Sequence, residues 1–221
     1  MSRRSVVLTL IVACVCAAAP LVALAAPVFN ALFGLSPSVP PPAMVFVYHG
    51  WHVDAAGAAK GQAAQKTVRL IKAQLDLVEA SGLKPAVLDA MRATPIVVEA
   101  GVAPEAATYS RALGVKAHAR QLDAIKPILL RQLLAAFFDH GLPGAAVADI
   151  GRYRAQILTR RAWPKSAAML QNDRDFFAIT AAAYLHDGIT REPYNRANLR
   201  KTQPDYYQWL AQLFDDGRAR R

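Results

Sequence analysis

Apolar and polar residues follow two periodic patterns along this chain, and each pattern predicts one kind of element. Short runs rich in β-branched and aromatic residues, which are typical of strands, cover 44–48, 95–99 and 113–118. Longer segments with apolar residues every three or four positions, which predict helices, cover 67–80, 85–92, 123–139, 145–158, 166–186 and 204–214. Because the strands come first, the expected class is α+β, with a small N-terminal strand region followed by a mainly helical C-terminal half.

Aspartate, proline and glycine mark the expected ends of two of these helices. Asp123 is expected to cap the helix that has Pro127 in its first turn and ends at Gly141. Pro204 is expected to start the last helix, because proline fits the first helical position.

Residues 1–26 have the layout of a secretory signal peptide, with two arginines ahead of an apolar run over 6–19 and Ala-Leu-Ala at 23–25. The run is short and ends near Pro20, which favours removal over a permanent membrane anchor. A lipoprotein signal is a third interpretation, because Cys14 ends a lipobox-like sequence. The chain is therefore expected in the periplasm or outside the cell, with membrane contact only through an uncleaved signal or a lipid on Cys14.

The rest of the chain divides by composition into three parts. A proline-rich stretch over 27–43 predicts an extended linker, 44–216 a folded domain, and 217–221 a basic tail. The only cysteines, Cys14 and Cys16, lie inside the signal. The mature chain is thus expected to contain no disulfide, no cysteine nucleophile and no cysteine metal ligand.

The charge balance changes this picture little. The 221 residues are 54% apolar and 19% charged, which suits a globular domain, and the net charge is +10. The basic residues are scattered, which indicates solubility first and adhesion to anionic surfaces second. Aromatic residues interleaved with Lys and Arg, as in a nucleic-acid platform, are absent, so no nucleic-acid partner is expected.

Several segments carry a resemblance to a known family. The stretch 126–143 reads K-P-I-L-L-R-Q-L-L-A-A-F-F-D-H-G-L-P, and 169–186 contains N-D-R-D-F-F-A-I-T; the others are 75–83, 191–199 and 203–210. Together they resemble bacterial zinc peptidases of the lethal-factor-like gluzincin type. The resemblance implies a zincin-like domain over 44–216, with the active helix in the first stretch and the third zinc ligand in the second.

The resemblance also shows which positions have changed. Arg131 stands at the first zinc-binding His, Gln132 at the general-base Glu, Ala135 at the second His and Asp175 at the third ligand. A guanidinium repels a divalent cation, an amide takes no proton from water at neutral pH, and a methyl group has no donor atom. These positions therefore predict no catalytic residue, no metal and no cofactor.

Two hypotheses follow for the vacated cleft. Arg131 is expected either to form an ion pair with Asp175 or to point, like Asp175, to solvent. Arg131, Asp175 and Tyr184 are the candidates for binding a peptide or protein in the cleft.

The expected function is that of an exported, catalytically inactive peptidase-like protein with a binding or regulatory role. The alternatives are a hydrolase with a non-zinc site in the same cleft, and a basic envelope protein without a pocket function.

The histidines offer weaker candidates. His49 and His52, with Asp54, form a metal-capable group, but the ordinary interpretation is a loop at the end of a strand. His140 is expected in the last turn of its helix, where a cation suits the helix dipole. The sequence has no nucleophile elbow, glycine-rich phosphate loop or dinucleotide fingerprint.

Overall fold

The computed structural model describes residues 44–58, 60–161, 163–186 and 195–214. The predicted signal peptide (1–26), linker (27–43) and basic tail (217–221) lie outside the described residues. All described residues belong to one compact unit of the chain, Pro41–Arg221.

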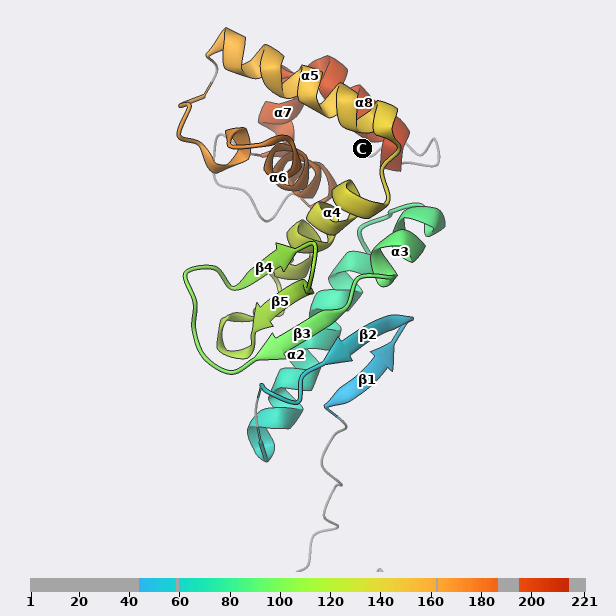
Figure 1. Ribbon diagram of the computed structural model, residues 1–221, viewed down its shortest axis with the longest axis vertical. Helices are drawn as coiled ribbons and strands as arrows, with labels where there is room; N and C mark the ends of the chain where they lie inside the picture. Colours follow the sequence, from blue (N-terminus) through green and yellow to red (C-terminus); the bar gives the residue numbers. More distant parts are fainter. Residues whose placement is uncertain (1–43, 59, 162, 187–194, 215–221) are drawn as a thin grey trace, which may run out of the picture. The chain divides into compact units, whose positions relative to one another are not determined.

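Within the described residues the strands form one five-stranded sheet in the order β1-β2-β3-β5-β4 (Figure 1). The strands are β1 Val45–Tyr48, β2 Trp51–Asp54, β3 Ile96–Glu99, β4 Ala107–Ser110 and β5 Gly114–His118. The three central strands, β2, β3 and β5, run parallel. The two edge strands, β1 and β4, are antiparallel to their neighbours, so each edge ends in a hairpin.

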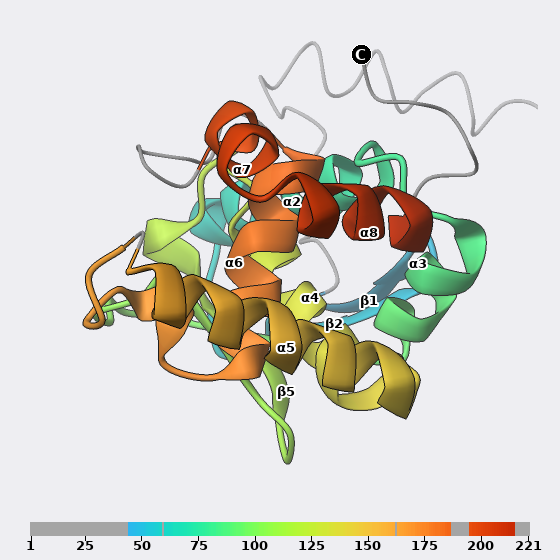
Figure 2. The ribbon, with the colours of Figure 1, turned by 90° about the horizontal axis from the view of Figure 1, so that it is seen from above.

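The α-helices of the described residues connect the strands and then build the second half of the chain. They are α2 Gln62–Glu79, α3 Pro85–Arg92, α4 Ile128–His140, α5 Gly144–Arg160, α6 Asp173–Leu185, α7 Arg196–Thr202 and α8 Pro204–Phe214. Helix α4 contacts α2, α3, β4 and β5 on one side and α6 on the other. Helix α6 is contacted by α5, α7 and α8, which surround it in Figure 2.

A single apolar core joins the sheet to the helices. Helix α4 contributes four leucines that are fully buried: Leu129, Leu130, Leu133 and Leu134. Burying a leucine side chain stabilises a fold by about 1.5–3 kcal/mol relative to its exposed state, so these four side chains hold α4 firmly between its neighbours. The backbone positions of the polar residues on α4 are therefore fixed.

The α+β class is confirmed, and most predicted elements are present. The predicted strands correspond to β1, β3 and β5, and the predicted helix over 85–92 matches α3. Strands β2 and β4 and helix α7 were not predicted, whereas α2 and α3 lie between strands, as their predicted ranges 67–80 and 85–92 imply. Two α4 predictions need correction, because Asp123 accepts the backbone N–H groups of Ile125 and Lys126 in a preceding turn, and α4 starts only after Pro127.

The segment predicted as one helix over 166–186 is divided in two. A short 3₁₀ helix, η2 Ala168–Leu170, precedes α6. Asn172 caps α6, because its side-chain oxygen accepts the backbone N–H of Asp175 at 2.8 Å. A capping asparagine satisfies an N–H group that has no partner inside the helix, so it sets the start of α6.

Candidate functional site

Three of the four changed zinc-site positions lie on α4, and two of their side chains hold the segment that leads into β4. The Arg131 guanidinium lies 2.6 Å from the Glu105 carboxylate. The two side chains are 41% and 54% exposed, so water screens this ion pair. Arg131 thus ties α4 to the residues just before β4 at a modest gain in stability.

Gln132 makes the more buried of the two ties. It is 7% exposed, and its amide nitrogen donates to the carbonyl oxygen of Ala107, the first residue of β4, at 2.8 Å. The carbonyl oxygen of Ala106 accepts from His118 of β5. Because the backbone groups of an antiparallel strand alternate in direction, those of Ala107 and Tyr109 point away from β5, to the free edge of the sheet. Gln132 therefore occupies one outward carbonyl of this edge.

Asp175 has a local partner, and of the two hypotheses for Arg131 the one with an Arg131–Asp175 ion pair is wrong. The Asp175 carboxylate accepts a hydrogen bond from the Asn172 amide nitrogen at 2.8 Å, while its own backbone N–H donates to the Asn172 side chain. Among the described residues, Glu105 is the carboxylate that Arg131 reaches. Both charges are thus satisfied by near partners, and neither is left alone in a cleft.

Ala135 and Tyr184 are parts of the core. Ala135 is 5% exposed and Tyr184 is 1% exposed. The Tyr184 ring packs edge-on against Tyr207 with ring centroids 5.0 Å apart, and it also stacks on Phe214. Asp175 and Tyr184 lie at opposite ends of α6, about 13.5 Å apart along the helix axis. The structure therefore does not bring Arg131, Asp175 and Tyr184 together in one cleft.

A pocket of about 330 Å³ lies between the start of β4 and the start of α4. It is lined by Glu105, Ala106, Ala107, Lys126, Pro127, Ile128, Arg131 and Gln132. Of the predicted site residues it contains Arg131 and Gln132. Among the described residues no carboxylate forms an ion pair with Lys126, so its ammonium group adds positive charge to the rim of the pocket.

A second group of polar side chains ties the other end of β4 to α4 and α6. Asp139, whose side chain is 5% exposed, lies 2.8 Å from Arg111 and 3.5 Å from Arg174. The Tyr109 hydroxyl lies 3.0 Å from His140, and the prediction that His140 belongs to the last turn of its helix is confirmed. No sequence pattern pointed to this cluster, because its members come from β4, the turn after it, α4 and α6.

The charges of this cluster shift two pKa values. Burial by itself raises the pKa of Asp139. Hydrogen bonds from Arg111 and Tyr109 and the charges of Arg111 and Arg174 lower this pKa by more than burial raises it, so the net shift is downward. Burial and the nearby Asp139 carboxylate raise the pKa of Tyr109 to about 12. Asp139 is therefore a stable anion and Tyr109 a stable neutral phenol, which suits a structural link better than proton transfer.

The histidines near the first strand lie in a tight hairpin. His49 and Gly50 have φ angles of 49° and 84°, as a two-residue turn between antiparallel strands requires, and Trp51 already belongs to β2. His49 lies 3.8 Å from Asp76, and His52 is exposed on β2. In the part of the chain that the structure describes, no three His, Cys, Asp or Glu side chains are grouped to share a metal ion.

Comparisons with models of protein families, with curated proteins and with solved structures return no match for this chain. Among the described residues no single helix is long and apolar enough to cross a membrane, although α4 and α5 reach the required length and composition as a pair bent by 120°.

Proposed function

We propose that this chain is an exported, non-catalytic binding protein on a zincin-like framework, and that it holds an extended acidic peptide along the free edge of β4. The signal-like N-terminus and the resemblance to gluzincin-type peptidases support the first part. The observation that carries the second part is the backbone N–H and C=O of Tyr109, which point away from β5 and are bonded by no described residue.

The chemistry of α4 supports binding without catalysis. A glutamate at position 132 would serve as a proton acceptor for water, whereas the amide of Gln132 has its N–H group directed to a carbonyl. Arg131 is occupied by Glu105, and Ala135 is packed in the core. None of these three side chains offers a ligand to zinc, and the first two hold α4 against the start of β4.

The edge of β4 supports a peptide as the ligand. Tyr109 directs its backbone N–H and C=O away from β5, and no described residue bonds to these two groups. Outward backbone groups of an edge strand pair readily with another extended chain, and the side chains at alternate positions give specificity. The neighbouring pocket with Lys126 on its rim offers a place for one acidic side chain of that peptide.

A displayed library of random peptides, selected on the purified protein, supplies probes for this proposal. Selected peptides are then measured by calorimetry, and each backbone amide is methylated in turn. Strand pairing predicts that methylation weakens binding at every second position, because only alternate N–H groups face the partner strand. Replacement of the acidic residue and Lys126→Ala should each weaken binding about fivefold, and their effects should not add.

Lys165→Ala, which removes an exposed lysine from a segment outside this pocket, is the matched control and should leave the affinity unchanged. The proposal fails if the selection yields no peptide that binds. It also fails if methylation acts without alternation, or if Lys165→Ala and Lys126→Ala have equal effects.

A further inference from the structure

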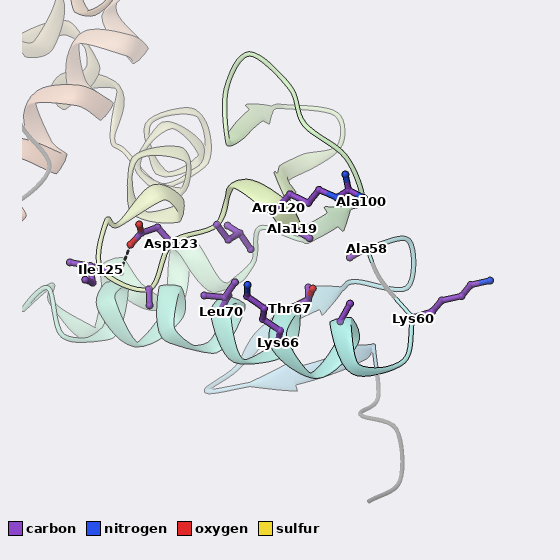
Figure 3. A pocket seen from close by; sticks show the side chains of 13 residues that line it. Ala58, Lys60, Lys66, Thr67, Leu70, Ala100, Ala119, Arg120, Asp123 and Ile125 are labelled. Atoms are coloured by element: carbon purple, nitrogen blue, oxygen red, sulfur yellow. Dashed lines mark hydrogen bonds between the residues drawn. The ribbon is translucent and has the colours of Figure 1, made fainter.

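A larger pocket, of about 820 Å³, lies at the carboxyl ends of the three parallel strands. Ala58 follows β2, Ala100 follows β3 directly, and Ala119 follows β5 directly. The start of α2 forms the remaining wall (Figure 3). In sheets with parallel strands, the loops that leave the carboxyl ends enclose a crevice where ligands commonly bind.

Cationic side chains are gathered around this pocket. Lys60 and Lys66 belong to the segment before α2 and to α2 itself, and Arg120 belongs to the short helix η1 Ala119–Gln121. Figure 3 shows Lys66 and Arg120 on opposite walls, whereas Lys60 extends away. Within the described ranges none of the three forms an ion pair. A region with an excess of positive charge attracts an anion.

The one carboxylate in the lining does not neutralise these cations. The Asp123 side chain accepts the backbone N–H groups of Ile125 at 2.6 Å and of Lys126 at 3.0 Å. These two hydrogen bonds lower the pKa of Asp123, so its negative charge is stabilised by the turn. Among the described residues Asp123 forms no ion pair with Lys66 or Arg120, so both cations keep their capacity to bind a ligand.

Thr67 adds a hydroxyl group at the bottom of the pocket. The residue is 5% exposed and lines the pocket between Lys66 and Leu70. Among the described residues no group forms a hydrogen bond with its side chain, although Thr159, Thr180 and Thr202 all bond to a carbonyl of their own helix. The Thr67 oxygen is not among the fully buried side-chain atoms that lack a partner, so it is open to the pocket and can bond to water or to a ligand there.

The rest of the lining is apolar, so the pocket favours a ligand that also has an apolar part. Leu70, Leu122 and Ile125 line the space together with several alanines, and Ile125 is 77% exposed. When an apolar group of a ligand covers an exposed isoleucine at the mouth of a pocket, apolar surface is removed from water, and this favours binding. The lining thus combines two cations, one hydroxyl and a larger apolar wall.

From this lining we infer that the pocket binds a small amphiphilic anion, a carboxylate or phosphate carried on an aliphatic group. The anionic head lies between Lys66 and Arg120 and accepts the Thr67 hydroxyl, and the aliphatic part lies against Leu70 and Ile125. This site is separate from the edge of β4 and does not depend on the proposed peptide.

Octanoate, octyl phosphate, octanol and inorganic phosphate are the probes, and calorimetry with the purified protein is the measurement. The two amphiphilic anions should bind at least about tenfold more tightly than octanol or inorganic phosphate, because only they fill both parts of the pocket. The stronger of the two anions identifies the head group. Binding should weaken with rising salt, since it depends on exposed charges.

Three substitutions assign the binding to this pocket. Lys66→Met and Arg120→Met keep an apolar stem without the charge, and each should weaken binding of the anions about tenfold. Thr67→Val removes only the hydroxyl and should weaken binding about fivefold. Arg69→Met, on an exposed position of α2 outside the pocket, is the matched control. Thermal unfolding of each variant, compared with the unchanged chain, separates a lost site from a lost fold.

Equal affinities for octanol and octanoate would overturn the inference, because the cations would then play no part. Equal effects of Arg69→Met and Lys66→Met would overturn it as well, since any surface charge would then suffice. The inference would also be overturned if neither amphiphilic anion bound at millimolar concentration.

Discussion

Replacement of Gln132 is the most direct test of the link between α4 and β4. Gln132→Ala removes the donor from the Ala107 carbonyl, and Gln132→Glu places a carboxyl group at the same point. The site is nearly dry, because Gln132 is 7% exposed and Ala107 is 2% exposed. Both variants keep the helical propensity of α4, because alanine and glutamate are good helix formers.

The expected loss in free energy of unfolding follows from the burial of this hydrogen bond. A buried acceptor that loses its donor costs about 1–3 kcal/mol, so Gln132→Ala should fall in that range at pH 7. In the Gln132→Glu variant, an ionised carboxylate would add the cost of a buried charge facing a carbonyl oxygen, and the loss should rise to about 3–4 kcal/mol.

The pH dependence distinguishes the two variants. Burial and the facing carbonyl raise the pKa of the introduced glutamate above its unfolded value of about 4.3. The folded state then binds a proton more tightly than the unfolded state, so the deficit of Gln132→Glu shrinks as the pH falls from about 7 to about 5. The protonated form of the introduced carboxyl group can donate to the Ala107 carbonyl, whereas the deficit of Gln132→Ala has no such dependence.

Urea unfolding followed by tryptophan fluorescence measures both effects, and Gln156→Ala on an exposed position of α5 is the control. A Gln132→Glu variant as stable as the unchanged chain at neutral pH would refute the reasoning. So would a deficit of this variant that stays constant between the two pH values.

Two further predictions concern the charged groups around β4. Arg131→Ala should cost less than about 1 kcal/mol of unfolding free energy, because Arg131 and Glu105 are both half exposed; a loss above about 2 kcal/mol in thermal unfolding would restore a buried role for Arg131. Asp139→Asn should cost about 1–2 kcal/mol at neutral pH, because two arginines lose their carboxylate. The pKa of Asp139 is lower in the folded state than in the unfolded state. The stabilisation from the Asp139 carboxylate is therefore present above the unfolded pKa and is lost as the pH falls through the folded pKa. Unfolding curves of the unchanged chain and of Asp139→Asn that stay separated by the same amount at about pH 2 would contradict this expectation.

The elements with strong periodicity could be predicted from the sequence, whereas those that depend on partners could not. At β2 the sequence favours a loop, because His49 and Gly50 resemble the end of a strand, but their positive φ angles make a hairpin. Strand β4, with the sequence Ala-Thr-Tyr-Ser, has little apolar periodicity and is held by β5 and by α4. Tertiary pairing fixes such strands, and no local pattern indicates it.

The site could be predicted only in part for a similar reason. The resemblance placed Arg131 and Gln132 correctly on one helix. Their partners lie 26 and 25 residues earlier in the chain, in a segment that carries no motif. For Asp175, the nearby Asn172 is a local partner, and such a partner competes well with a distant guanidinium. The large pocket at the strand ends could not be predicted, because it depends on which strands are neighbours.

One buried amide has a consequence for both pockets. Gln74 of α2, which is fully buried, donates to the carbonyl oxygens of Asp123 and Lys126 and accepts the backbone N–H of Leu129 at 3.0 Å. The turn it holds contributes Asp123 to the large pocket and Lys126 to the small one. Because three hydrogen bonds already immobilise this shared wall, a ligand arriving at either side meets a preorganised surface and loses little free energy to ordering it.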